Sequence, residues 1–212
     1  MNMLEMKLQE INGEVVRMLS HVKESVELAR QALIYADPEA AARCTENDRR
    51  VGLIQDQLER DILTLIARRQ PAASDLRFLA AMYRALADIE RAGNYAEHVA
   101  RAGAELATSP PLKKYLDLAR VFDVIVAMIE ETIKALAESD VQAARRAHVM
   151  DDEIDDLYQQ VQRELLTYMM EDPKTISRAT KLLNVGRYLE RLGDHFENVN
   201  EHIIFWLTGE RL

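Results

Sequence analysis

Carboxylate side chains recur at helical spacing in two segments of the second half of the chain. One segment carries them at i, i+4, i+7 and i+11, which places them on a single helix face: Glu190, Asp194, Glu197 and Glu201. In the other, residues 151–156, five of the six residues are Asp or Glu. There, Asp151 and Asp155 form an i,i+4 pair of like charge, which costs a helix roughly 0.2–0.5 kcal/mol when nothing neutralises it. A cation bound between the two segments would reverse the sign of that repulsion.

These carboxylates have two interpretations. An acidic helix face is most often a solvated surface, and the spacing alone does not exclude that reading. The alternative is a metal site, because ligands that are all oxygen suit hard cations such as Mg²⁺, Ca²⁺ or Mn²⁺, or iron, better than a structural zinc site. The residues by themselves leave both interpretations open.

Motifs of common catalytic and nucleotide-binding sites are missing from the sequence. A ferritin-like di-metal oxidase needs Glu-x-x-His pairs, and no histidine of this chain has a glutamate three residues before it. The chain also lacks G-x-x-x-x-G-K-[ST], H-E-x-x-H and G-x-S-x-G. The single cysteine, Cys44, lies in a helical segment among Ala and Arg and is expected to be a small packing residue. We predict that the protein is not an enzyme.

The segments that position these residues are predicted to be long helices. Seven Gly and five Pro in 212 residues are about half the usual share, so the chain has few turns. Between the breaks run six segments with apolar spacing near the helical period. At the breaks, Asp37 and Asp172 each precede a proline and are expected to cap a helix, as is Ser74 after Pro71. We predict an all-α protein of six long antiparallel helices.

The six helices are predicted to be two copies of a three-helix unit. Residues 90–99 align with residues 190–199, and five of the ten positions are identical. Upstream the offset becomes 103, so that Asp37 matches Asp140 and Asp48 matches Asp151. The slip of three residues falls at the break before the third helix of each unit, where a change of length costs little. We expect two tandem, pseudo-symmetric three-helix bundles, 1–108 and 109–212.

The acidic stripes are incomplete in the first copy. Asp48 and Glu90 stand where the second copy has carboxylates, but the residues four positions after them are Gly52 and Asn94 rather than Asp. We therefore expect the second copy to bind metal more tightly than the first.

Gly93 and Gly193 stand at matching positions of the two copies, each in a helix interior. Glycine there costs up to about 1 kcal/mol relative to alanine. We expect that each allows a close approach of a neighbouring helix beneath the acidic face.

Charge and composition limit the possible partners and the compartment. The net charge of −9, of which −6 lies after residue 106, favours cations or basic protein surfaces and disfavours nucleic acid. A single cysteine fits a reducing cytoplasm. The N-terminus reaches Glu5 before any apolar run, and the longest stretch without a charged residue is residues 202–209. We therefore expect a cytoplasmic protein with neither a signal peptide nor membrane insertion.

Several motifs resemble the PhoU family of phosphate-uptake regulators. Residues 89–94, Ile-Glu-Arg-Ala-Gly-Asn, and 189–194, Leu-Glu-Arg-Leu-Gly-Asp, are similar to the doubled E-R-x-G-D signature of that family. Residues 67–77 and 166–172 also resemble it, and the similarity covers essentially the whole chain in length, repeat and helix breaks.

The resemblance implies two three-helix bundles whose paired E/D-x-x-x-D motifs hold metal ions or small metal clusters at the bundle surface. The matching residues are Asp151, Asp155, Glu190 and Asp194 in the second bundle and Asp48 and Glu90 in the first, and Glu197 continues the same stripe. The expected cofactors are divalent or trivalent ions, namely iron, manganese, magnesium or zinc, bound more strongly by the second bundle.

The resemblance also implies a function without catalysis. Family members act when phosphate is plentiful: they restrain a phosphate ABC transporter and keep a phosphate-sensing histidine kinase in its non-signalling state. The expected partners are the ATPase subunit of that transporter, the kinase and a second copy of the chain as a homodimer. A metal-buffering bundle and a purely structural helical adaptor are the alternatives.

Five charged residues are candidates for partner contacts: Arg69, Asp75, Arg77, Arg91 and Arg191. Arg91 and Arg191 each follow a candidate ligand, and each could pair with a carboxylate of the neighbouring helix. The alternative for both is a surface arginine whose ion pair contributes less than about 1 kcal/mol. The other three flank the corner at residues 70–75, where a helix break plus a cap explains most of the pattern.

Overall fold

The structure, a computed structural model, describes residues 3–211. Its helices are α1 (Met3–Ile34), α2 (Pro38–Arg69), α3 (Ala73–Leu106), α4 (Leu116–Glu138), α5 (Val141–Val149), α6 (Asp151–Glu171) and α7 (Ile176–Thr208), with a 3₁₀ turn, η1 (Pro173–Thr175), before the last. No strand occurs within the described range. In the same range, no helix is both long and apolar enough to span a membrane. The predicted all-α fold is confirmed.

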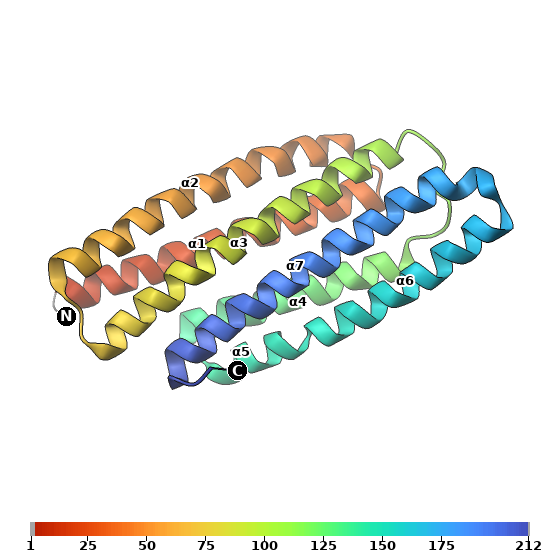
Figure 1. Cartoon of the computed structure of the whole chain (residues 1–212). Coiled ribbons are helices and arrows are strands. Elements are labelled where there is room, and N and C mark those ends of the chain that lie inside the picture. Colours follow the sequence, from red (N-terminus) through yellow and green to blue (C-terminus); the bar gives the residue numbers. More distant parts are fainter. Residues whose placement is uncertain (1–2, 212) are drawn as a thin grey trace.

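The helices form two bundles that lie side by side (Figure 1). Helices α1, α2 and α3 make up one bundle, and α4, α5, α6 and α7 make up the other. The bundles meet where α3 runs antiparallel to α7 and where α1 packs on α4. Because of these contacts, the buried apolar side chains form one continuous core through both bundles. The predicted boundary after residue 108 falls in the connection between α3 and α4, and it stays a prediction.

The two bundles repeat one pattern of buried positions. At the offset of 103, Leu19 of α1 corresponds to Phe122 of α4, and both side chains are buried. Leu58 of α2 corresponds in the same way to Val161 of α6, and both are again buried. Because the offset preserves burial on two helix pairs, equivalent residues of the two bundles can be compared position by position.

The fifth predicted helix is not continuous, which corrects the expectation of six unbroken helices. It is divided at Met150 into α5 and α6. The N–H of Met150 donates to the carbonyl of Ala147 at 3.2 Å, the short i−3 pattern of a tightened turn. Three acidic residues fill the first turn of the new helix: Asp151, Asp152 and Glu153. Acidic side chains are favoured at a helix N-terminus, where the unpaired N–H groups point outward.

Most of the predicted caps are present. Asp37 accepts hydrogen bonds from the N–H groups of Glu39 and Ala40, at 2.9 and 3.2 Å, with Pro38 at the first helical position. Asp172 accepts from the N–H of Lys174 at 3.0 Å, but it opens the 3₁₀ turn η1 rather than α7. The prediction for Ser74 is wrong. α3 begins at Ala73, so Ser74 lies inside the helix, and no side chain caps it.

Cys44 is a packing residue, as predicted. Its thiol is completely buried on α2, and its Sγ lies 3.5 Å from the carbonyl oxygen of Ser25 on α1, to which the S–H donates. Burial raises the pKa of this thiol to about 12, so it carries no thiolate at neutral pH.

Candidate functional site

Asp151, the first residue of α6, lies among the other predicted carboxylates of the second bundle. The residue is only 7% exposed although it carries a carboxylate. It lies against the backbone of Gly193 on α7, where a β-carbon would come within 2.4 Å of Asp151 Oδ1 and 2.9 Å of Ile154 Cδ1. Gly193 therefore provides the space into which Asp151 packs, which confirms the close approach predicted for this glycine.

The five carboxylates predicted for the second bundle are brought together. The pKa of Asp151 is raised to about 7, first by burial and then by the negative charges of Glu197, Asp194, Asp155 and Glu190. Burial is also the first cause of the raised pKa values of Asp155, Glu190 and Glu197, and neighbouring carboxylates add to each. The negative charges of these carboxylates therefore repel one another, and each makes its neighbours harder to ionise. We call these five residues the second carboxylate cluster.

Arg191 compensates part of this charge, but not in the predicted way. Its Nη1 donates to Oδ2 of Asp194 at 2.8 Å, and its Nε lies 3.5 Å from Oε2 of Glu190. Both partners belong to α7 itself, so the predicted pairing with a carboxylate of the neighbouring helix is wrong. The reason is local: the i,i+3 spacing to Asp194 lets the guanidinium reach its own helix face.

His148 lies beside the second carboxylate cluster and is not among the predicted site residues. Its Nδ1 lies 3.6 Å from Oε1 of Glu197, and this nitrogen is buried without a hydrogen-bond partner. The sequence contained a usable signal, because His148 precedes Asp151 by three residues and so shares its face on a near-continuous helix.

The first bundle repeats this arrangement with fewer charges. Oδ1 of Asp48 would lie 3.5 Å from a β-carbon on Gly93, an ordinary contact distance and not a clash, so the close approach predicted for Gly93 is wrong. The pKa of Asp48 is raised to about 6 by burial and by the charges of Glu90 and Glu97, while His98 lowers it. Glu97, the counterpart of Glu197, was not predicted, although the sequence repeat places it at the matching position.

The first carboxylate cluster consists of Asp48, Glu90 and Glu97, and neutral side chains donate hydrogen bonds to the two glutamates. Asn94 Nδ2 donates to Oε1 of Glu90 at 2.8 Å, and Thr45 Oγ1 donates to Oε1 of Glu97 at 3.0 Å. The second bundle has the charged Asp194 at the position of Asn94. Asn94 thus supplies a hydrogen bond to Glu90, whereas Asp194 repels Glu190 at the matching place in the second bundle.

Three oxygen atoms of these clusters are buried and accept no hydrogen bond: Asp48 Oδ1, Asp151 Oδ1 and Glu190 Oε2. A buried acceptor without a donor is costly, so a cation at such a place would be stabilising. Across residues 3–211, however, no group of three or more His, Cys, Asp or Glu side chains is arranged to hold a metal ion. The donor chemistry suits a hard cation, but the side chains form no finished coordination sphere and would have to rotate to make one.

Comparison with known proteins matches the repeat to a family. The family model described as the PhoU domain matches the chain twice, over residues 15–103 and 118–203. The chain belongs to the PhoU family. Each match lies within one of the two bundles, so the resemblance predicted from the E-R-x-G-D motifs is confirmed.

Relatives and a solved structure match this PhoU chain along its length. A protein of Deinococcus radiodurans, named phosphate-specific transport system accessory protein PhoU homolog, is 44% identical over 208 residues, which is 98% of each chain. A protein of Aquifex aeolicus with the same name is 35% identical over 204 residues, which is 96% of this chain and 92% of the relative. The crystal structure of PhoU from Pseudomonas aeruginosa has a TM-score of 0.93 at 32% identity and covers 97% of this chain and 99% of its own.

The residues predicted for partner contacts of this PhoU chain do not gather at one place. Arg69 is exposed, with its Nη2 2.7 Å from Sδ of Met3. Arg77 is half-buried, and a β-carbon on Gly209 would come within 2.5 Å of its Nη1. Arg91 is exposed, but it lies 14 residues further along α3 than Arg77, or about 21 Å.

Asp75 is half-buried and lines a hollow beside Trp206. Of the five predicted contact residues, only Arg69, Asp75 and Arg77 therefore share the end of the molecule where α2 passes into α3. Arg91 and Arg191 lie beside the carboxylate clusters and belong to a different surface.

Proposed function

We propose that this chain is an accessory regulator of phosphate transport. The observation that carries the proposal is the match over 98% of both chains to a relative named a phosphate-specific transport system accessory protein. The match of both halves to the PhoU domain supports the same role for the whole chain. The absence of common catalytic motifs from the sequence favours action through binding rather than through catalysis.

In this proposal the protein acts as a negative regulator in the cytoplasm. When phosphate is plentiful it contacts the ATPase subunit of the phosphate ABC transporter and the phosphate-sensing histidine kinase, and it limits both uptake and the starvation response. Two-fold repetition of one bundle, and a net charge of −9, suit a protein that presents similar surfaces to basic regions of its partners. A homodimer is part of the same proposal.

Metal ions organise the acidic faces in the proposed mechanism. In the second bundle Asp151, Asp155, Glu190, Asp194 and Glu197 would hold them, and in the first bundle Asp48 and Glu90. A bound cation would neutralise the mutual repulsion that raises the pKa of Asp151 and would give a partner to the buried oxygens that accept no hydrogen bond. The all-oxygen donors favour manganese, magnesium or iron, whereas nitrogen from His148 would also admit zinc.

Deletion of the gene in the source organism tests the regulatory proposal. Transcription of phosphate-starvation genes is measured in high phosphate in the parent strain, in the deletion strain and in a strain that carries a restored copy. Repression should be lost on deletion and return with the restored gene. If deletion leaves repression unchanged, the regulatory role is rejected, and a metal-buffering or structural role becomes the better explanation.

A further inference from the structure

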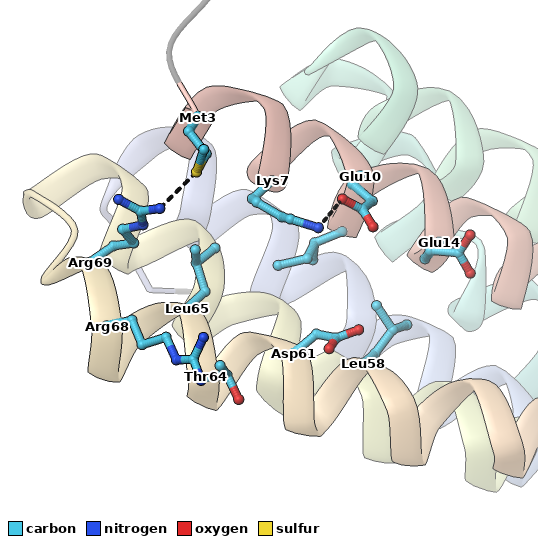
Figure 2. A pocket seen from close by; sticks show the side chains of 11 residues that line it. Met3, Lys7, Glu10, Glu14, Leu58, Asp61, Thr64, Leu65, Arg68 and Arg69 are labelled. Carbon is cyan, nitrogen blue, oxygen red and sulfur yellow. Dashed lines mark hydrogen bonds and ion pairs between the residues drawn. The ribbon is translucent and has the colours of Figure 1, made fainter.

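A groove opens between the beginning of α1 and the end of α2 (Figure 2). Its volume is about 260 Å³, and apolar side chains of both helices, among them Ile11, Leu58 and Leu65, line it together with charged ones. Pockets for drug-sized ligands usually measure about 300–1,000 Å³. The groove is therefore of a size for one or two side chains rather than for a larger metabolite.

The first turns of α1 that line this groove have no helical counterpart in the second bundle. Helix α4 begins at Leu116, which the offset of 103 places opposite Gly13 of α1. The nine residues of α1 directly before Gly13, 4–12, therefore correspond to the irregular connection that leads into α4. The two bundles differ at this end in what covers the gap between their first and second helices.

In the second bundle a lysine of that connection occupies the corresponding place. The ammonium of Lys113 pairs with Glu164 of α6 and lies 3.6 Å from Oδ2 of Asp117 on α4. Only 6% of the Lys113 side chain is exposed. Leu112 and Tyr115, on either side of it, pack against the apolar core. The segment thus inserts a lysine between two carboxylates and anchors it with apolar neighbours.

The carboxylates that correspond to this lysine site in the first bundle are Glu14 and Asp61. They are the equivalents of Asp117 and Glu164 at the offset of 103, and both line the groove. Each has its short-range partner on its own helix: Glu14 pairs with Arg17 at 2.6 Å, and Asp61 accepts from Gln57 at 3.0 Å.

Lys7 is the basic side chain of the groove whose charge interacts with Asp61, and Figure 2 shows it turned along α1 toward Glu10. Its Nζ lies 2.6 Å from Oε2 of Glu10, which leaves Asp61 a more distant partner for its charge. Thus no lysine is inserted between Glu14 and Asp61 in the way that Lys113 lies between Asp117 and Glu164.

We propose that the groove between α1 and α2 binds a short segment of a partner protein that presents a lysine flanked by apolar residues. The lysine would lie between Glu14 and Asp61, and its apolar neighbours would pack against Met3, an exposed apolar side chain of the lining. The lining also holds Lys7, Arg68 and Arg69, so the charge complementarity is local to Glu14 and Asp61. The occupant follows from these two carboxylates and from the chain's own second bundle, which shows a segment of this chemistry in the equivalent place. The proposal does not depend on metal binding by the carboxylate clusters.

A peptide with the sequence of residues 109–117, blocked at both ends and carrying a fluorophore, tests the proposal. Its binding to the full-length protein is measured by fluorescence anisotropy, and folding of each variant is checked by its thermal unfolding curve. Binding should be saturable, weaken with salt, and fall at least about tenfold in the variant with both Glu14→Gln and Asp61→Asn. A peptide with glutamine in place of the lysine at position 113 should bind as weakly.

Two control proteins locate the site. The variant with Glu27→Gln and Asp56→Asn removes two exposed charges from the same two helices outside the groove, and it should bind like the parent. Glu164→Gln should not weaken binding either, because it alters only the site from which the peptide sequence is taken.

Four results would overturn the proposal. They are the absence of saturable binding, an equal loss of binding in the Glu27/Asp56 variant, a loss with Glu164→Gln, and a dimer of the protein that the Glu14/Asp61 substitutions dissociate. The last of these would assign the groove to a second copy of the chain.

Discussion

Asp151 of α6 packs against Gly193 of α7, so closely that only a residue without a β-carbon fits at position 193. A β-carbon at position 193 would stand 2.4 Å from Asp151 Oδ1, whereas one at position 93 would stand 3.5 Å from Asp48 Oδ1. The same motif glycine is therefore required for space in one bundle and not in the other. This difference can be measured.

Gly193→Ala should destabilise the protein, and Gly93→Ala should not. Overpacking of a tight core contact costs about 1–3 kcal/mol, and at position 193 the methyl group would also meet Ile154. At position 93 the methyl group has room, so the higher helix propensity of alanine should add up to about 1 kcal/mol. Urea unfolding of the metal-free proteins gives both values. Equal effects of the two substitutions would contradict the packing assigned to Gly193.

The metal-free protein should lose stability as the pH rises from about 4 to about 7. The ordinary pKa of Asp151 is 3.8 and its pKa in the folded protein is about 7. Between these values the folded state binds more protons than the unfolded state, so unfolding becomes easier with rising pH. Asp48, with a pKa of about 6, acts in the same direction.

Asp151→Asn should therefore stabilise the metal-free protein at pH 8 and flatten its stability between pH 4 and pH 7. We expect a gain of roughly 1–2 kcal/mol, less than the whole pKa shift implies, because water screens part of the cluster. Unfolding by urea in the presence of EDTA at several pH values gives the profile. The exposed Asp56→Asn is the control and should leave the profile unchanged. An unchanged profile in Asp151→Asn would refute the assignment.

The second carboxylate cluster should bind metal more tightly than the first. Placing the missing aspartates of the second cluster in the first should raise the affinity of the first. Asp194→Asn is expected to weaken Mn²⁺ binding by about tenfold or more, since it removes a charged oxygen donor. Asn94→Asp together with Gly52→Asp should create a second, tighter site, and Gly52 has no atom within 4 Å of a β-carbon that would prevent the change.

Calorimetric titration with Mn²⁺, supported by elemental analysis of protein purified without chelator, measures these affinities. Asn94→Ala serves as the control and should have little effect. If Asp194→Asn and Asn94→Ala lose metal equally, the ranking of the clusters is wrong. If the parent protein binds no metal and its melting temperature ignores Mn²⁺, iron and Mg²⁺, the metal part of the proposed function is rejected.

The helices, their doubling and the family could be predicted from the amino-acid sequence alone. The features that predict them are local properties of the chain: helix periodicity, scarce Gly and Pro, and the matched segments around Glu90 and Glu190. Such properties suffice for long helices, because the hydrogen bonds of a helix join residues that are close in sequence. The grouping of Asp155 with Glu190 was expected from the resemblance to the PhoU family, because an acidic stripe by itself can equally face solvent. The Asp37 cap, in contrast, was predictable from the local sequence.

Only the tertiary structure decided how these charges are satisfied. Whether Arg191 pairs within α7 or across to α6, whether Asn94 hydrogen-bonds Glu90, and how closely Asp151 packs on Gly193 depend on distances between helices, which a periodic pattern does not contain. The same holds for the groove at Glu14 and Asp61. The sequence repeat makes these residues equivalent to Asp117 and Glu164, but the folded chain alone shows a lysine inserted in one bundle and an open groove in the other.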